Sequence, residues 1–120
     1  AKTLVAFANS GGGRLLIGIK DNGRITGIQP EEEQHVIEHA LHRYCRPHLS
    51  VRYERVVVGV KQVLIASVKP GKALPYQALG EDHKWWVYIR YQDQTILPGP
   101  VVVESLRRKR PEVPNLIVLD

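Results

Sequence analysis

The sequence has little of what secreted and membrane-spanning proteins require. It contains one cysteine, Cys45, so no disulfide can form within the chain, and a reducing cytoplasm is the simplest setting for it. No apolar run approaches the roughly 20 residues that cross a bilayer, and no secretory signal peptide is recognisable. Methionine is absent and the chain begins at Ala1, which indicates a fragment of a longer protein. We therefore expect a cytoplasmic protein with no membrane partner.

The composition is that of one folded domain. A chain of 120 residues is long enough for a single hydrophobic core, and a hydrophobic content of 43% is typical of globular proteins. The formal net charge of +5 favours a polyanionic partner, most simply nucleic acid. The same modest charge also serves to keep a small domain in solution. Charge alone leaves both interpretations open.

Glycine and proline divide the first half of the chain into short elements. Three glycines at 11–13 end the first helix, and Asp21-Asn22-Gly23 is typical of a tight turn between strands. Pro30 opens a second helix, and the three glutamates after it offset the positive end of the helix dipole. The predicted elements are a helix over 2–9, a strand over 14–20 buried on both faces, a strand over 24–28, and a helix over 30–44.

The second half of the chain predicts mainly strands. A hairpin is expected over 51–60 and 62–69, followed by a strand over 84–91 and a short helix over 101–109. The whole pattern predicts a mixed α/β (α+β) fold in a single domain. Its central mixed sheet should be packed by two main helices.

One stretch resembles a known family. Residues Ala6 to Ile28 read AFANSGGGRLLIGIKDNGRITGI, which is similar to the core motif of the Schlafen-type AlbA-like domain. Weaker similarities follow in order as far as Gln94. The resemblance implies a nucleic-acid-binding domain over 1–107, truncated at its N-terminus, from a bacterial or archaeal transcriptional regulator. It implies DNA rather than RNA as partner, and no cofactor. Residues 108–120 are then a basic linker and an apolar tail strand.

The glycine-rich loop is one candidate phosphate contact. Backbone N–H groups of a glycine turn can form an anion-binding concavity, which makes Gly12, Gly13 and Arg14 candidates. The alternative is a simple helix stop before a central strand. Further phosphate candidates are Lys20, Arg24 and Arg90.

An aromatic strand is a candidate surface for stacking bases. In an extended strand Trp86, Tyr88 and Arg90 share one face, which could stack bases and hold phosphate. The alternative is cross-strand packing with Arg90 at the rim.

A basic cluster near the end is the remaining candidate for backbone contact. It comprises Arg107, Arg108, Lys109 and Arg110. Cations at a helix end offset the negative end of the dipole, whereas a flexible basic arm would bind nucleic-acid backbone.

Three histidines lie on one side of the 30–44 helix. His35 and His39 have the i, i+4 spacing that can chelate a divalent metal, and His42 lies on the same side. No metalloprotease pattern accompanies them, so we expect an exposed polar face and no metal site.

Two other classes of function stay open. Some Schlafens are ribonucleases, and Asp21 falls near one position of their carboxylate cluster, so a metal-dependent nuclease completed by missing upstream carboxylates is the enzyme alternative. A dimerisation module is the other. The apolar run Leu116 to Leu119 has strand character and could add to the sheet of its own chain or to that of a second copy; we favour exchange between two copies, giving a homodimer.

Overall fold

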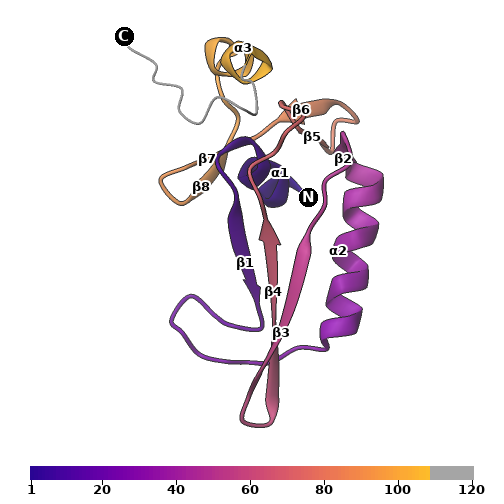
Figure 1. The fold of residues 1–120 in the computed structure, drawn as a ribbon, viewed down its shortest axis with the longest axis vertical. Coiled ribbons are helices and arrows are strands. Elements are labelled where there is room, and N and C mark those ends of the chain that lie inside the picture. Colours follow the sequence, from indigo (N-terminus) through magenta and orange to yellow (C-terminus); the bar gives the residue numbers. More distant parts are fainter. Residues whose placement is uncertain (109–120) are drawn as a thin grey trace.

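The structure is a computed structural model that describes residues 1–108 (Figure 1). It combines helices with strands that pair in antiparallel sheets, so the mixed α+β class predicted from the sequence is confirmed. In chain order they are α1 (Lys2–Asn9), β1 (Gly13–Ile17), α2 (Pro30–Tyr44), β2 (Cys45–Arg46), β3 (Arg52–Val58), β4 (Lys61–Val68), β5 (Gln77–Leu79), β6 (Trp85–Val87), β7 (Ile89–Tyr91), β8 (Gln94–Ile96) and α3 (Pro100–Arg108).

The main sheet has three antiparallel strands in the order β1-β4-β3. The predicted hairpin of β3 and β4 is present, and it turns at Gly59, whose φ of 65° suits glycine. In the central strand β4, Leu64 and Ala66 are fully buried. Two smaller sheets, β2-β5-β6 and β7-β8, lie at the other end of the molecule (Figure 1). The sheet structure is thus divided and antiparallel, where the sequence predicted one central mixed sheet.

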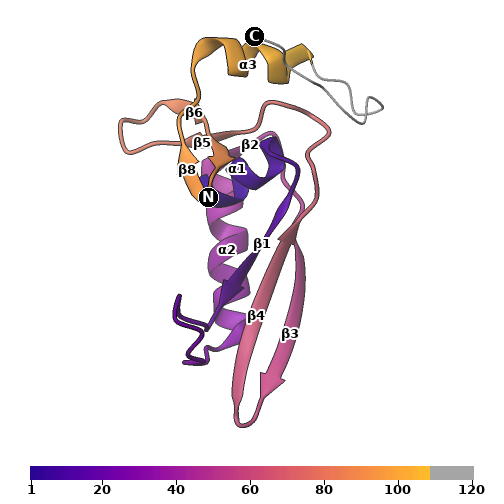
Figure 2. The same cartoon turned by 90° about the vertical axis from the view of Figure 1, so that its left-hand side faces the viewer.

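Helix α2 has the predicted bounds and lies along one face of the main sheet (Figure 2). Two side chains of β3 attach the strand to it, because the Tyr53 hydroxyl donates to Glu38 and Arg55 pairs with Glu31 at 3.5 Å. Alternation along a strand then places Arg52 on the opposite face.

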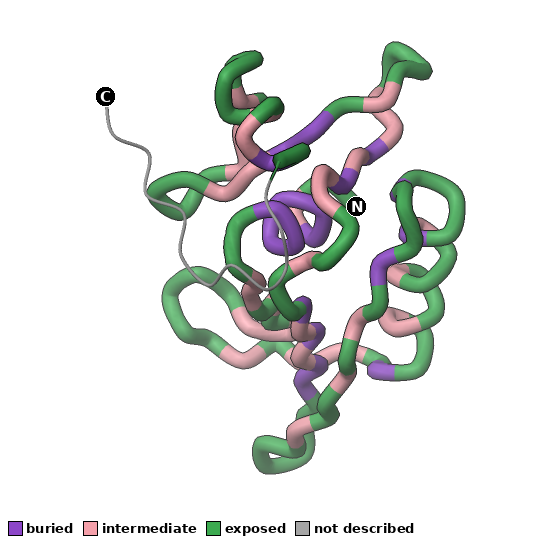
Figure 3. The backbone as a smooth tube through the Cα atoms, turned by 45° about the horizontal axis from the view of Figure 1, so that its top comes forward, coloured by how far each residue is buried: buried purple, intermediate pink, exposed green. Residues whose placement is uncertain are grey.

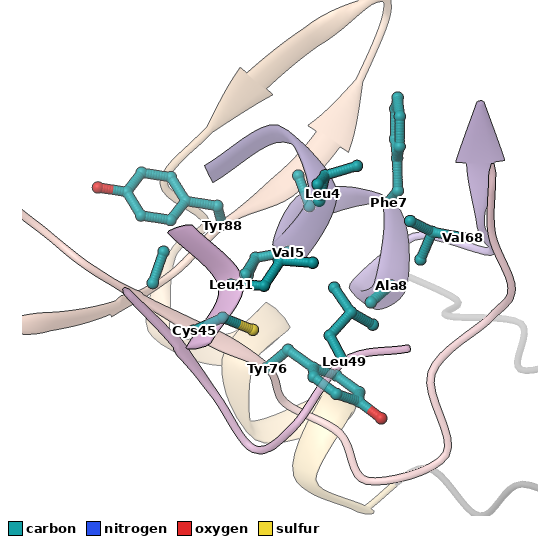
Figure 4. Packing of buried hydrophobic residues seen from close by; sticks show 12 residues of the cluster. Leu4, Val5, Phe7, Ala8, Leu41, Cys45, Leu49, Val68, Tyr76 and Tyr88 are labelled. Carbon is teal, nitrogen blue, oxygen red and sulfur yellow. The ribbon is translucent and has the colours of Figure 1, made fainter. Parts of the chain in front are cut away.

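The core is centred on α1, which lies where the sheets meet (Figures 1 and 3). Leu4, Val5 and Ala6 of this helix are at most 4% exposed. Around them pack side chains from α2, β4 and the loops, including Leu41, Leu49 and Tyr76 (Figure 4). A short helix of small and apolar residues therefore holds the three sheets together.

Two predictions about the first strands are wrong. Strand β1 lies at the edge of the main sheet rather than in its centre, and Leu16 on it is 49% exposed. Residues 24–28 form only an isolated bridge between Ile19 and Ile25. The reason is that Gly18 and Gly27 adopt φ values of 103° and 76° and fold the segment back on itself. The backbone N–H groups of Thr26 and Gly27 both donate to the Gly18 carbonyl.

The predicted aromatic strand over 84–91 is also wrong as a single element. It divides at Tyr88 into β6 and β7, which belong to different sheets. Asn9 causes the break, because its side-chain amide nitrogen donates a hydrogen bond of 2.8 Å to the Tyr88 carbonyl. That carbonyl is thereby drawn toward α1 and away from the ladder of a continuous strand.

Among residues 1–108, no helix combines the length and the apolar content needed to cross a bilayer.

Candidate functional site

A hollow of about 550 Å³ lies at the end of the main sheet where β1 begins and β4 ends. The Gly11–Gly13 loop forms one wall, and three cationic side chains, Arg14, Arg52 and Lys69, contribute to its lining. We call this hollow, which Ser67 of β4 also lines, the basic groove.

The register of the sheet explains how the two arginines come together. Ser67 of the central strand is paired on one side with Arg14 and on the other with Arg52. Directly paired residues point to the same face, so the three side chains form a row across the sheet on the face opposite α2. Neighbouring strands lie about 4.8 Å apart, which places the two arginine backbones about 10 Å from each other. Two exposed guanidinium groups therefore flank one hydroxyl.

The glycine loop forms a wall because it packs closely on the chain that leaves β4. A Cβ on Gly12 would lie 2.6 Å from the Val68 carbonyl oxygen, and the φ of Gly12 is 87°. The Gly12 N–H donates to the Phe7 carbonyl at 2.7 Å and so ends α1. The Gly12 N–H is thus used to end α1, and the contribution of the loop to the basic groove is the wall that it forms.

A second hollow of about 440 Å³ adjoins the basic groove and shares Arg52, Ser67 and Lys69 with it. Its further walls include His48 and Lys72. Four cations thus follow one continuous surface, with Glu54 as the carboxylate among them. Within the described part of the chain, none of the four forms an ion pair.

Sequence reasoning found Arg14 and missed Arg52, Lys69 and Lys72. The signal for two of them was present in the predicted hairpin over 51–69. Pairing its strands around Gly59 places Arg52 opposite Ser67, with Lys69 two residues further along. What the sequence could not supply was the neighbour of this hairpin, namely β1 with Arg14.

The structure places Lys20 and Arg24 away from the basic groove. They close the turn at the far end of β1, where the Lys20 N–H donates to the Arg24 carbonyl at 2.9 Å. They lie beyond the end of β1, whose extended part from Arg14 to Ile17 alone spans about 10 Å at about 3.3 Å per residue. Asp21, the residue of the enzyme alternative, is exposed in the same turn.

The predicted shared face of Trp86, Tyr88 and Arg90 does not form. Tyr88 is only 9% exposed and belongs to the core. Arg90 lies 5.7 Å from the centre of the Phe7 ring and donates to the Thr95 hydroxyl at 3.0 Å. Tyr88 and Arg90 therefore follow the alternative interpretation, in which these side chains pack within the fold.

Trp86 is held at the surface by Asp82. The tryptophan is 39% exposed, and its indole N–H donates to the Asp82 carboxylate at 2.9 Å. The backbone N–H of Lys84 and the indole N–H hold the pKa of that carboxyl below its usual value. The indole N–H is thus bound by the loop that precedes β6.

The other predicted positions are separate from the groove. Arg107 and Arg108 lie in the last turn of α3, where Arg108 pairs with Glu104 at 3.1 Å. Lys109 and Arg110, like the tail from Leu116 to Leu119, fall outside the described residues.

No metal centre is assembled by the described residues. The helix side that carries His35, His39 and His42 is exposed, as the sequence predicted. Throughout residues 1–108, no group of three or more His, Cys, Asp or Glu side chains is placed to hold a metal ion. Cys45 is buried, and burial raises the pKa of its thiol to about 11.

The fold and the groove define a small α+β domain with a basic surface at one end of its main sheet. The family model described as Schlafen, AlbA_2 matches residues 1–98, and the chain belongs to this family. That membership supports a role connected with nucleic acid.

A comparison with solved structures agrees on the fold. The chain is similar to the crystal structure of the DIP2311 protein from Corynebacterium diphtheriae, with a TM-score of 0.51 and 21% identity. The similarity covers 79% of this chain but 18% of that protein. No curated protein matches the chain.

Proposed function

We propose that this domain binds the phosphate backbone of nucleic acid in the basic groove. The observation that carries the proposal is the row of Arg14, Ser67 and Arg52 across the three strands of the main sheet. Guanidinium groups hold phosphate oxygens by charge-assisted hydrogen bonds, and a hydroxyl between them can donate one more. Membership of the Schlafen, AlbA_2 family supports the same class of partner.

The geometry favours positioning over reading of sequence. Phosphate contacts fix the orientation of a protein on nucleic acid but carry no direct sequence information. Within the described residues, the groove is lined by cations and a hydroxyl from strands and loops, and none of its lining residues lies on a helix that could enter a major groove. We therefore propose binding that depends strongly on salt and weakly on sequence.

Finer features of the proposal rest on the family resemblance. We propose DNA rather than RNA as the partner, a homodimer, a cytoplasmic location, and a place in a transcriptional regulator. The nuclease alternative places its other carboxylates upstream of Ala1, and residues 1–108 supply only Asp21 toward such a cluster. Binding is the function for which these residues supply a complete set of groups, and it is the function we propose.

The test is a set of binding titrations across a salt series. Labelled duplex DNA, single-stranded DNA and RNA of the same length are titrated with the chain, and binding is followed by fluorescence anisotropy. We expect the logarithm of the affinity to fall linearly with the logarithm of salt concentration, because phosphate neutralisation releases counterions. Absence of binding to all three at low salt would refute the proposal.

A further inference from the structure

Arg46, an arginine outside the basic groove, is held in a fixed orientation. The guanidinium carbon of Arg46, at the end of β2, lies 4.3 Å from the centre of the Trp85 ring. The Nε of the same arginine donates to the Gln77 side-chain carbonyl at 2.8 Å. Arg46 itself is exposed. An exposed arginine fixed by two neighbours loses less conformational entropy when it binds a ligand than an unrestrained one does.

The register of the small sheet β2-β5-β6 produces this arrangement. Arg46 is paired directly with Gln77, which is paired in turn with Val87. Trp85 lies two residues before Val87, so it stands on the same face of the sheet. The contact thus follows from strand pairing.

The terminal nitrogens of Arg46 remain available for an anion. Of the five guanidinium donors, only the Nε–H has an acceptor among residues 1–108, and no carboxylate there pairs with the group. The surrounding sequence is basic, since residues 42–48 read HRYCRPH, with two arginines, two histidines and no acid. An unpaired, oriented guanidinium in such a segment is complementary to a phosphate group.

The two chain segments that line the second hollow continue directly to this arginine. His48 is a lining residue and follows Arg46 by two positions, and Tyr76 is a lining residue and directly precedes Gln77. The chain therefore leads from the walls of the second hollow directly to Arg46 of β2 and to its partner Gln77.

We infer that Arg46, held by Trp85 and Gln77, is a further phosphate-binding position at which a nucleic acid seated in the basic groove makes an additional contact. The inference rests on the proposed function. It predicts that the Arg46 contact is made only by strands long enough to extend beyond the groove.

The test uses oligonucleotides of increasing length with the variants Arg46→Gln and Arg43→Gln. Arg43 is the matched control, because it is an exposed arginine three residues away whose guanidinium lies 5.8 Å from the Tyr44 ring. We expect Arg46→Gln to weaken binding of long strands about tenfold, to reduce the salt slope by about one, and to leave the shortest bound strands unaffected. Arg43→Gln should change binding little.

A third variant separates orientation from folding. Gln77→Ala keeps the charge of Arg46 but removes its Nε partner, so we expect a smaller loss of affinity with the salt slope unchanged. Thermal unfolding of each variant identifies any that fails to fold, and Gln77→Ala then decides the outcome. If Arg46→Gln and Arg43→Gln bind equally well, the inference is overturned and the groove proposal stands. If Arg46→Gln does not fold, unchanged binding by Gln77→Ala overturns the inference in the same way. No binding by the unmodified chain would overturn both.

Discussion

Asn9 connects three backbone groups of separate segments. It is the one buried polar residue among residues 1–108, with 4% of its surface exposed. Its amide donates to the Tyr76 and Tyr88 carbonyls at 2.9 and 2.8 Å, and its carbonyl accepts the Tyr76 N–H at 2.8 Å. The asparagine in the AFANS motif therefore joins α1 to the starts of β5 and β7.

Replacing Asn9 by Ala should destabilise the domain by at least about 2 kcal/mol, because several buried backbone groups lose their partners. Urea unfolding followed by circular dichroism measures the loss. Ser10→Ala is the control, since its hydroxyl accepts one exposed N–H, from Arg90 at 2.8 Å, and should cost clearly less. Equal costs for the two variants would contradict this role for Asn9.

Two neighbouring glycines offer a comparison at the same scale. Gly11 and Gly12 have φ values of 89° and 87°, but a Cβ on Gly11 meets nothing within 4 Å, whereas one on Gly12 meets the Val68 carbonyl at 2.6 Å. Gly11→Ala should cost about 1–2 kcal/mol of unfolding free energy through backbone strain. Gly12→Ala should cost about 1–3 kcal/mol more, because the loop must move from β4. Denaturant midpoints of the two variants would show the difference.

At the scale of elements, a tyrosine links α2 to the main sheet. Tyr53 of β3 donates its hydroxyl hydrogen to Glu38 of α2. Burial, together with the hydrogen bond to and the charge of Glu38, raises the pKa of Tyr53 above its usual value of 10.0. The folded state thus retains this proton at a pH where the unfolded chain releases it.

The stability that Tyr53 contributes is therefore complete below about pH 10 and lost as the pH rises further. We expect the free energy of unfolding to fall more between about pH 8 and pH 11 in the unmodified chain than in Tyr53→Phe, which has no titrating hydroxyl. Other alkaline groups titrate in both proteins and cancel in the comparison. If the unfolding free energies of the two proteins change equally with pH, the Tyr53–Glu38 hydrogen bond does not contribute in this way.

Elements with strong local signals could be predicted from the sequence. Helix α2 follows from Pro30 and the glutamates after it, and the β3–β4 hairpin follows from two strand-forming runs on either side of Gly59. The strand predicted over 84–91 failed because Asn9, almost 80 residues earlier, takes the Tyr88 carbonyl. Local pattern carries no information about such a partner.

At the scale of the whole molecule, the candidate site depends on strand order. The sequence supplied Arg14 and the glycine loop, but their neighbours Arg52 and Lys69 come from a hairpin about 40 to 55 residues later. Only the order β1-β4-β3 brings them together. Lys20 and Arg24, which the sequence grouped with Arg14, are separated from it by the length of β1.

This separation provides a charge-matched test of the central claim. The double variant Arg14→Gln/Arg52→Gln removes two positive charges at the basic groove, and Lys20→Gln/Arg24→Gln removes two at the other end of β1. Both leave the same net charge, so a general electrostatic effect lowers their affinities equally. If binding takes place specifically in the basic groove, only the affinity of the Arg14→Gln/Arg52→Gln variant falls.

The most direct measurement is the salt dependence of binding to one labelled DNA duplex by the unmodified chain and these two double variants. We predict that the groove variant loses at least about tenfold in affinity and about two units of salt slope, since two phosphate contacts disappear. The variant at Lys20 and Arg24 should stay within about twofold of the unmodified chain. Equal losses in the two double variants would contradict the account.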